Sequence, residues 1–534
     1  MEILLNFVER KEIETMKNWI KAGIFTPQDP REWVRKKTTR EILEREKELI
    51  KRLSKKGVEV IKGGEKLPEE DQVAWNTKLV FRHIDYLVKN KIDVLIVNEA
   101  AWTFPYDTID AIKYYGERIG KPPKVLMFSH MERSVPGLVA GMAIEGGLKR
   151  IGYSCYMVYG LPEESGVIDE IVGVLRFLKG RIEAEKKVME VLKKLPKQKY
   201  IAFGGMSLKM PTTTADVDQW QKIFKVSYDA LDQSVILERA WKLVEWKGKP
   251  GESEYRIIDQ RVKNAKKYIL EEGHGKVDFS RPKLRGPEKL VYQLSLFYAV
   301  YDICKERNCT FAGIKCQDEL SARECTACIP TAFLNNDVGP DGKRKKIIPT
   351  ACENDMDSAL TQLLLHLLSG RPAGFGDFRD IRDGILYIIN CGQHPPYFFG
   401  KPDEEPEKKL DRVEYLGQEI YYLAGGSAVR GRTPAGQIMT VARLGRDNLR
   451  YKMVALPIET IEVKKDEHEM YDYSWPIIKG RIPISEKELV EMWPCNHLAF
   501  TYGDYTPHLV ELCEHLNIGY TIYDREGRKY YRPP

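Results

Sequence analysis

Hydrophobic positions in the first part of the chain form short continuous runs separated by amphipathic stretches. The runs 91–97 (KIDVLIV), 124–129 (KVLMFS) and 151–159 are typical of strands that are buried on both faces. The intervening stretches 108–119 and 137–148 carry apolar residues at helical spacing. Strands that alternate with helices of this length predict a parallel sheet with helices on both faces.

Polar and aromatic residues follow these predicted strands directly. Asn98, Glu99 and Trp102 come after the 91–97 strand, and His130 comes after the next one. Parallel sheets of this kind place their ligands at the carboxyl ends of the strands. We therefore expect these side chains to face a ligand-binding edge.

The same alternation continues beyond residue 160 and then changes in character. A long amphipathic helix over 167–195 precedes buried strands at 200–205, 310–316 and 347–352. After about residue 400 the pattern becomes richer in strands, with glycine turns between them. The C-terminal part is therefore expected to contain more β-structure than the rest.

These elements predict an α/β fold in three domains. Residues 1–160 and 161–345 are expected to form two doubly wound α/β N-terminal domains. Residues 346–534 are expected to form a C-terminal α/β domain with a β-rich, barrel-like part that carries the metal and sugar site. A chain of 534 residues agrees with this division, since about 150 residues per domain is usual.

Charge and composition exclude several classes of protein. The 84 Lys and Arg residues nearly balance the 78 Asp and Glu residues, which argues against a nucleic-acid partner, because such proteins concentrate basic charge on one face. No apolar run approaches the ~18 residues that cross a bilayer. The N-terminus lacks the basic and apolar segments of a signal peptide, and the ten cysteines are sparse for this length. We expect a reduced, cytoplasmic protein without a membrane partner.

Side chains with metal-ligand chemistry lie at three strand boundaries. Glu319 follows one predicted strand, Glu353 and Asp355 follow another, and His497 precedes a strand near the C-terminus. Carboxylates with one imidazole suit Mn²⁺ or Mg²⁺ better than thiophilic metals. Each residue on its own also fits an ordinary helix cap or a solvated position at the end of a strand. The spacing of these four residues in the sequence does not bring them together.

The cysteines offer a competing site. Cys325 and Cys328 form a CxxC motif, with Cys316 upstream and Cys352 downstream. Four such thiols suit a zinc or iron–sulfur site, and a CxxC pair also suits redox chemistry. A thiolate metal or redox protein is therefore an alternative, although Cys316 and Cys352 also fit ordinary buried strand positions.

Several segments resemble the L-fucose isomerase and L-arabinose isomerase superfamily, most closely its L-fucose isomerase branch. These segments are GIKCQDEL (313–320), ACENDMDSALTQLLLHLLSGRPAGFGDFRD (351–380), LYIINCG (386–392), YYLAGG (421–426), SWP (474–476) and NHLAFTYGDY (496–505). AAWTFPYDTID at 100–110 resembles the N-terminal pocket loop of that family. The END sequence and the Asn-His pair are specific in combination.

The resemblance implies an intramolecular oxidoreductase that interconverts an aldose and a ketose through a cis-enediol with Mn²⁺, or with Mg²⁺ or Co²⁺ in its place. By position, it implies Glu319, Asp355 and His497 as metal ligands, with Glu319 and Asp355 also acting as the catalytic pair. Glu324 and Glu353 remain alternatives for the glutamate ligand. No nicotinamide, flavin or phosphate site is implied, in agreement with the lack of a Rossmann or P-loop glycine pattern.

The resemblance also implies a monosaccharide substrate and a homo-oligomer, most simply a hexamer. Cys391, Tyr421, Trp475 and Asn496 would line the sugar, and Trp102 would come from a neighbouring subunit. Cys391 stands where typical fucose isomerases have serine. L-fucose, D-arabinose, L-arabinose and related aldoses all remain open as substrates, and a non-catalytic sugar-binding relative remains an alternative.

Overall fold

The computed structural model describes residues 18–132, 135–280, 284, 286–418, 422–471 and 473–534. The described chain forms two compact units. Unit 1 extends to Glu185 and includes Tyr531–Pro533, and unit 2 extends from Lys186 to Tyr530. These units do not test the predicted division at 160 and 345, which stays a prediction.

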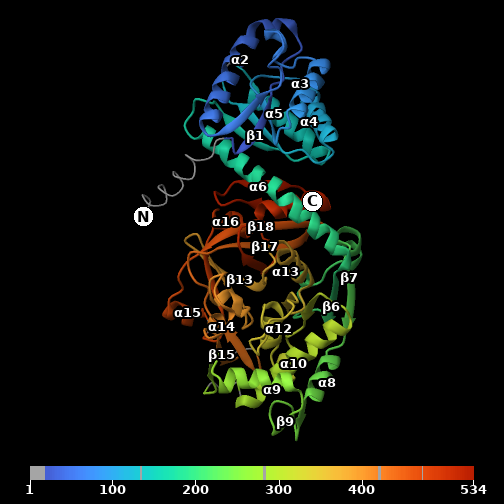
Figure 1. The fold of residues 1–534 in the computed structure, drawn as a ribbon, viewed down its shortest axis with the longest axis vertical. Coiled ribbons are helices and arrows are strands. Elements are labelled where there is room, and N and C mark those ends of the chain that lie inside the picture. The colour runs from blue at the N-terminus through green and yellow to red at the C-terminus, as the bar shows by residue number, and fades with distance from the viewer. Residues whose placement is uncertain (1–17, 133–134, 281–283, 285, 419–421, 472) are drawn as a thin grey trace. The chain divides into compact units, whose positions relative to one another are not determined.

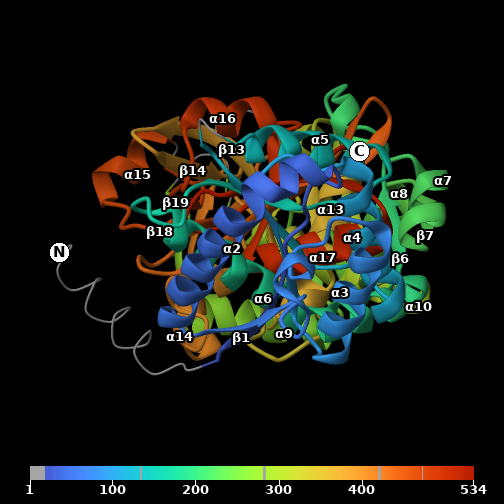
Figure 2. The ribbon, with the colours of Figure 1, turned by 90° about the horizontal axis from the view of Figure 1, so that it is seen from above.

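Unit 1 is built on a parallel sheet in the order β2-β1-β3-β4-β5. Its strands are β1 (Ile20–Phe25), β2 (Val58–Lys62), β3 (Val94–Glu99), β4 (Val125–His130) and β5 (Tyr156–Gly160). Its helices are α2 (Glu32–Lys55), α3 (Thr77–Lys89), α4 (Pro105–Ile119) and α5 (Gly137–Arg150). Figure 1 shows α2 on one face of this sheet and α3 and α4 on the other, and α3 and α4 lie side by side there (Figure 2). The predicted doubly wound sheet is confirmed.

Burial on both faces explains the continuous apolar runs of these strands. All six residues of β3 are buried, and Leu95 and Val97 pack in one core with Ile112 of α4 and Ile144 of α5. Helix α4 begins with Pro105 and ends at a left-handed glycine, which are the usual start and stop signals of a helix. The loop between β3 and α4 is therefore held at both ends by regular structure.

Unit 2 contains a second parallel sheet, in the order β12-β11-β6-β7. Its strands are β6 (Lys199–Phe203), β7 (Ser227–Leu231), β11 (Phe311–Ile314) and β12 (Thr350–Cys352). The neighbouring helices are α8 (Ser234–Leu243), α10 (Gly286–Glu306), α12 (Cys328–Asn335) and α13 (Met356–Ser369). Helix α13 packs against β11 and β12 and leads from this sheet into the last part of the fold.

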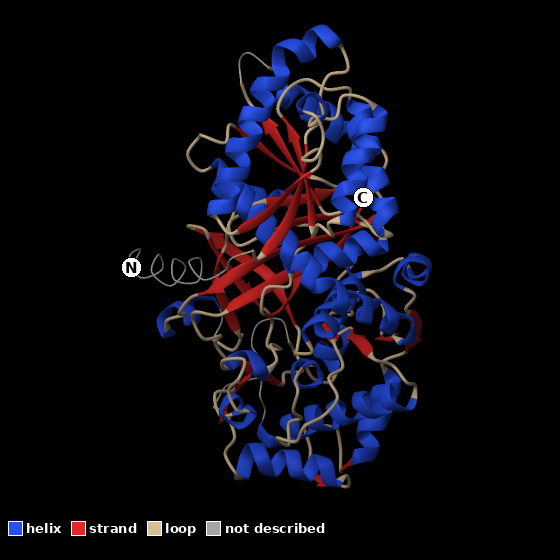
Figure 3. Cartoon of the chain, turned by 45° about the horizontal axis from the view of Figure 1, so that its top comes forward, coloured by secondary structure: helices blue, strands red, loops and turns tan. Residues whose placement is uncertain are grey.

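The C-terminal part of unit 2 is a closed barrel. Its strands are β13 (Gly374–Arg382), β14 (Ile385–Ile389), β17 (Ile438–Asp447), β18 (Arg450–Thr460), β19 (Ile477–Arg481) and β20 (His497–Tyr502). Because β17 pairs with both β20 and β18, the row β17-β20-β13-β14-β19-β18 closes on itself. Its interior is apolar, with Leu386, Val441, Leu456 and Phe500 fully buried. The predicted barrel-like part is confirmed (Figure 3).

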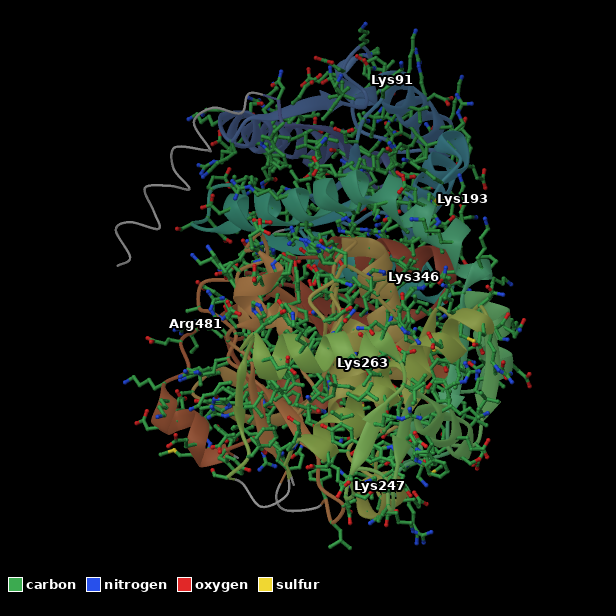
Figure 4. All side chains as sticks on the ribbon, turned by 60° about the horizontal axis from the view of Figure 1, so that its bottom comes forward. Lys91, Lys193, Lys247, Lys263, Lys346 and Arg481 are labelled. Atoms are coloured by element: carbon green, nitrogen blue, oxygen red, sulfur yellow. The ribbon has the colours of Figure 1, made fainter. Side chains whose placement is uncertain are left out.

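The remaining elements lie outside the two parallel sheets and the closed row of six barrel strands. They are α6 (Val167–Lys194), α7 (Val217–Gln219), α9 (Gln260–Lys266), α11 (Glu319–Arg323), α14 (Pro406–Leu410), α15 (Lys465–Tyr471), α16 (Glu486–Met492), α17 (Thr506–Leu516), β8 (Val244–Trp246), β9 (Tyr255–Ile257), β10 (Lys276–Asp278), β15 (Glu414–Gly417), β16 (Ser427–Arg430), β21 (Gly519–Tyr523) and β22 (Lys529–Arg532). Charged side chains such as Lys91, Lys263 and Arg481 lie on the surface (Figure 4). Within the described ranges, no helix combines the length and apolar character needed to span a membrane.

Candidate active site

A turn of unusual backbone conformation joins β12 to α13. Glu353 and Asn354 have φ angles of 57° and 52°. A left-handed residue other than glycine costs of order 1–3 kcal/mol and persists only where its surroundings fix it. Asn354 supplies these contacts, since its Nδ2 donates to the carbonyl of Gly204 (3.2 Å) and its Oδ1 accepts from the Tyr200 hydroxyl (2.7 Å). The turn is therefore tied to β6, which lies beyond β11 in the same sheet.

Gly313 in β11 leaves the space that this turn needs. A Cβ atom at that position would lie 2.4 Å from Asn354 Oδ1 and 2.0 Å from the Tyr200 hydroxyl. Both distances are shorter than a van der Waals contact, so a larger residue would displace Asn354. Gly313 therefore allows Asn354 to keep its contacts with Tyr200 and Gly204.

Asp355 uses both carboxylate oxygens within the protein. Oδ1 accepts from the backbone N–H of Ser358 (2.9 Å) and caps α13. Oδ2 accepts from His497 Nδ1 (2.7 Å) and from Arg443 Nη1 (2.8 Å). Burial alone would raise the pKa of Asp355, but the charge of Arg443 and the hydrogen bond from His497 hold this pKa below its usual value. Asp355 therefore stays ionised and orients the imidazole.

Strand pairing in the barrel brings a further carboxylate to the other side of His497. His497 begins β20 and lies opposite Asp377 of β13 in the antiparallel register. His497 Nε2 is 3.4 Å from Asp377 Oδ1 and 3.5 Å from Glu353 Oε2. These three side chains, Glu353, Asp377 and His497, form what we call the carboxylate–imidazole cluster.

The electrostatics of this cluster favour a positive charge at Nε2. Burial would lower the pKa of His497, but hydrogen bonds to Asp355 and Glu353 and the charge of Asp377 raise it well above its ordinary value. Burial raises the pKa of Asp377 to about 6, with Glu353 adding to the rise and His497 opposing it. The negative charge of the carboxylates therefore concentrates around one nitrogen atom.

Side-chain amides orient the two carboxylates of the cluster. Asn390 Nδ2 is 3.4 Å from Asp377 Oδ2, and Asn496 Nδ2 is 3.4 Å from Asp377 Oδ1. Gln317 Nε2 is 3.4 Å from Glu353 Oε1. Since amides are neutral donors, they hold the carboxylates in place and leave their charge available for a ligand.

The donors of the cluster suit a divalent cation in their chemistry. Among the described residues, no group of three or more His, Cys, Asp or Glu side chains is already arranged so that it could hold a metal ion. Two carboxylates and an imidazole are nevertheless the donors that Mn²⁺ and Mg²⁺ accept. The bond from His497 Nδ1 to Asp355 directs Nε2 toward Glu353 and Asp377, as carboxylate partners do for metal-binding histidines.

Comparison with known proteins identifies the family. A family model for the first N-terminal domain of L-fucose isomerase matches residues 19–186, and one for its C-terminal domain matches residues 388–524. Together the two matches span more than half of the chain. The chain belongs to the L-fucose isomerase family. The resemblance noted in the sequence is thereby confirmed.

Known relatives agree with this membership, two of them over most of their length. The L-fucose isomerase of Phocaeicola vulgatus is 21% identical over 514 residues, which cover 83% of each chain. That of Bacteroides fragilis is 21% identical over 510 residues, covering 83% of this chain and 82% of its own. That of Streptococcus pneumoniae is 25% identical over 250 residues, covering 38% of this chain and 42% of its own.

The other two candidate glutamates have partners away from the cluster. Glu319 forms an ion pair with Lys315 (2.6 Å), and its side chain is 52% exposed. Glu324 accepts from the hydroxyl of Tyr292 (2.9 Å). Of the three glutamates considered from the sequence, Glu353 is the one whose carboxylate faces His497.

Sequence reasoning did not single out Asp377 or the residues that hold the cluster. Asp377 lies inside the quoted segment 351–380, but as an acidic residue within a strand it has no local feature that marks it. Its opposition to His497 follows from the pairing of β13 with β20. Arg443 of β17 is likewise recognisable only once the barrel brings it to Asp355.

The residues predicted to line the sugar fall in different places. Trp475 donates from Nε1 to Gln418 Oε1 at 3.2 Å, and Asn496 is one of the amides that orient Asp377. Cys391 is half-buried just after β14. Tyr421 lies outside the described residues. Trp475, Asn496 and Cys391 therefore all belong to unit 2, as the cluster does.

Trp102 lies in unit 1, in the loop between β3 and α4. The buried carboxyl of Glu99 ties this loop down, because it accepts from the hydroxyls of Thr103 (3.2 Å) and Thr108 (3.0 Å). Burial raises the pKa of Glu99 to about 8, against the hydroxyl contacts that lower it. Glu99 therefore remains protonated at neutral pH.

This protonation gives unit 1 a predictable pH dependence. The folded protein holds the Glu99 proton to about pH 8, whereas an unfolded glutamate releases it near pH 4.5. Stability is therefore lost as pH rises between these values, by up to about 1.4 kcal/mol per pH unit. Glu99→Gln removes this loss, so its free energy of unfolding should exceed that of the wild type at pH 8 but not at pH 5, as measured by urea denaturation.

Glu117→Gln is the matched control for this prediction. Glu117 is an exposed glutamate of α4, in the same unit. Glu117→Gln should leave the pH dependence of the unfolding free energy unchanged. Equal pH dependence in Glu99→Gln and the wild type would contradict the assignment of a protonated Glu99.

Proposed function

We propose that this chain is an aldose–ketose isomerase acting on L-fucose, D-arabinose or a related monosaccharide through a cis-enediol. The carboxylate–imidazole cluster carries the proposal, because it places two carboxylates on one imidazole nitrogen in a chain of the L-fucose isomerase family. Paired carboxylates suit the proton transfer that such a reaction requires.

The proposal includes a divalent cation, Mn²⁺ or in its place Mg²⁺ or Co²⁺, held by Glu353, Asp377 and His497. When bound, such an ion acts as a Lewis acid toward sugar oxygens and makes the hydrogen on C2 more acidic. Compared with the ligands implied by resemblance, Glu353 and Asp377 take the places of Glu319 and Asp355. Contacts to His497 Nε2 support this change.

Each residue of the site has its own part in the proposed reaction. Glu353 and Asp377 take the proton from C2 and return it to C1. Asp355 has both oxygens engaged within the protein, so we assign it to orienting His497 through Nδ1. Arg443 keeps Asp355 ionised.

The sugar pocket is proposed to include Cys391, Trp475 and Asn496, together with Tyr421. Indole rings pack well against the C–H faces of a pyranose, which suits Trp475 and Trp102. We propose that Trp102 comes from a neighbouring subunit of a homo-oligomer, most simply a hexamer. The half-buried position of Cys391 just after β14 supports its place in the pocket.

An aldose panel tests this function directly. The full-length protein is treated with EDTA, dialysed, and assayed on L-fucose, D-arabinose and L-arabinose with and without added Mn²⁺ in D₂O. We expect ketose formation and deuterium at C1 or C2 with Mn²⁺, and at least about a tenfold loss of rate without it. Binding of an aldose without any exchange would favour the non-catalytic sugar-binding alternative.

Metal analysis of the purified protein separates the isomerase from the thiolate alternative. Stoichiometric manganese or magnesium that EDTA removes agrees with a site of carboxylates and imidazole. Stoichiometric zinc or iron that resists EDTA would favour a thiolate site built from Cys316, Cys325, Cys328 and Cys352.

A further inference from the structure

Four cysteine side chains from separate segments meet near the carboxylate–imidazole cluster. Cys316 follows β11, Cys328 begins α12, Cys352 ends β12, and Cys391 follows β14. The Cys352 thiol is in hydrogen-bond contact with the thiols of both Cys316 and Cys391. We call these four residues the thiol cluster. The ten cysteines, all within the described residues, form no disulfide bond.

Two members of the thiol cluster have partners other than thiols. The Cys316 sulfur accepts from the backbone N–H of Ala327 at 3.3 Å. The Cys328 sulfur lies 3.4 Å from the carbonyl oxygen of Cys391 and accepts from Gln418 Nε2 at 3.1 Å. Both members of the CxxC motif, Cys325 and Cys328, are fully buried, so an external reagent has no direct access to this pair.

The other two members differ in exposure. Cys352 is 3% exposed, and its side-chain hydrogen-bond contacts are with thiols. Cys391 is half-buried, whereas Cys316 and Cys328 are fully buried. A small reagent that enters the cluster would therefore reach Cys391 first, with Cys352 next to it.

The thiol cluster is connected to the proposed catalytic carboxylate in two ways. Cys352 immediately precedes Glu353 in the chain. The Tyr422 hydroxyl contacts the Cys391 thiol and accepts from Gln317 Nε2 at 3.1 Å, and the same Nε2 lies 3.4 Å from Glu353 Oε1. A change of bonding between Cys352 and Cys391 therefore acts on Glu353 through the backbone and through side chains.

We propose that Cys352 and Cys391 form a reversible oxidation site, at which a low-molecular-weight disulfide converts the two thiols into a protein disulfide and switches off the neighbouring site. First, the Cys391 thiolate attacks one sulfur of the small disulfide, forms a mixed disulfide and releases one small thiol. The Cys352 sulfur, losing its proton, then attacks the Cys391 sulfur and expels the second small thiol. Two protein thiols are oxidised, and the small disulfide is reduced to two thiols.

Disulfide geometry explains why this modification would switch off the site. A disulfide holds its sulfur atoms about 2.05 Å apart, much closer than two thiols in hydrogen-bond contact. Cys352 must therefore move toward Cys391. The left-handed turn at Glu353 and Asn354 has little freedom to absorb this movement, so Glu353 shifts away from His497. The loss of activity rests on the proposed function, whereas disulfide formation does not.

The experiment uses the full-length native protein and oxidised glutathione as the oxidant. After incubation, unreacted thiols are alkylated, and the protein is digested and analysed by mass spectrometry without reduction. We expect a cross-linked pair of peptides containing Cys352 and Cys391, and two fewer alkylated thiols per chain. Isomerase activity should fall in step with the cross-link, and dithiothreitol should restore both.

Three variants make the result specific. Cys352→Ala should stop the reaction at a glutathione adduct on Cys391, and Cys391→Ala should prevent both the adduct and the cross-link. Cys155→Ser is the matched control, since Cys155 is half-buried like Cys391 but lies in unit 1. This control should still form the cross-link at the wild-type rate.

Different outcomes separate the two proposals. A cross-link between other cysteines, such as Cys316 with Cys352 or Cys325 with Cys328, would overturn the assigned pair. So would a protein that stays active after incubation with oxidised glutathione and still carries a free Cys391 thiol. A protein that forms the Cys352–Cys391 bond but isomerises no aldose would refute the proposed function and leave the oxidation site standing. The peptide map of the wild-type protein identifies the cross-linked cysteines even if a variant fails to fold.

Discussion

Replacing Asp377 by asparagine should lower kcat for aldose isomerisation at least about 10³-fold, because the variant would lose both the cation-binding charge and the proton acceptor that we propose for Asp377. Asparagine keeps the size of the side chain and its place opposite His497 in the strand pairing. The effect is therefore expected in the chemistry and not in the fold. The measurements are kcat with saturating Mn²⁺ on the best aldose of the panel, and Tm by differential scanning calorimetry.

Asp380→Asn is the matched control for this variant. Asp380 lies on the same strand, β13, but pairs with Arg382 (2.7 Å) and accepts from the hydroxyl of Tyr471 (3.3 Å). It should leave kcat unchanged. If Asp377→Asn retained a kcat close to that of the wild type, Asp377 would have no part in proton transfer or in holding a cation.

The largest effect on stability is expected for Arg443→Met. Arg443 is 1% exposed, and it donates to Asp355 Oδ2 (2.8 Å) and to the carbonyl of Thr212 (2.9 Å). Its removal leaves the Asp355 charge buried with His497 as its remaining cationic partner. Breaking a buried ion pair in this way costs about 3–5 kcal/mol. Urea denaturation at pH 7 should show a loss of that size.

The pH dependence of the unfolding free energy and a second variant test whether the buried ion pair causes this loss. Arg443 lowers the pKa of Asp355, so its stabilising effect is present above the unfolded value of 3.8 and disappears as pH falls through the folded pKa. The difference in unfolding free energy between Arg443→Met and the wild type should therefore become smaller at acidic pH. Arg446→Met, on the same strand but 24% exposed and 3.9 Å from Asp357, should cost less than about 1 kcal/mol. Equal losses in the two variants would contradict a buried-pair effect.

Continuous apolar runs made the parallel sheets predictable, but not the ends of their strands. The predicted strand 91–97 corresponds to β3, Val94–Glu99, because Lys91 has a positive φ and belongs to the preceding turn. At the other end, β3 extends into Asn98 and Glu99, which are polar but fully buried. Hydrogen bonds such as the one from Asn98 Nδ2 to Thr26 compensate for this burial, and hydrophobicity alone does not reveal them.

The candidate site was predictable in its location and less so in its roles. Residues that directly follow a strand, such as Glu353 and Asp355, are visible in the sequence as candidates for chemistry. The different roles of Glu353 and Asp355 depend on contacts that form only when the barrel is folded. Asp355 is engaged by Arg443 from β17, and the place beside His497 Nε2 is taken by Asp377 from β13. No local pattern in the chain encodes these pairings.

The fixed turn at Glu353 and Asn354 has a practical meaning for protein engineering. Its contacts to Gly204 and Tyr200, and the space left by Gly313, form a scaffold that tolerates no added side-chain volume. Directed-evolution libraries aimed at a new sugar preference should therefore hold this scaffold constant. Diversity belongs instead at the proposed pocket positions Cys391 and Trp475, which lie outside the carboxylate–imidazole cluster.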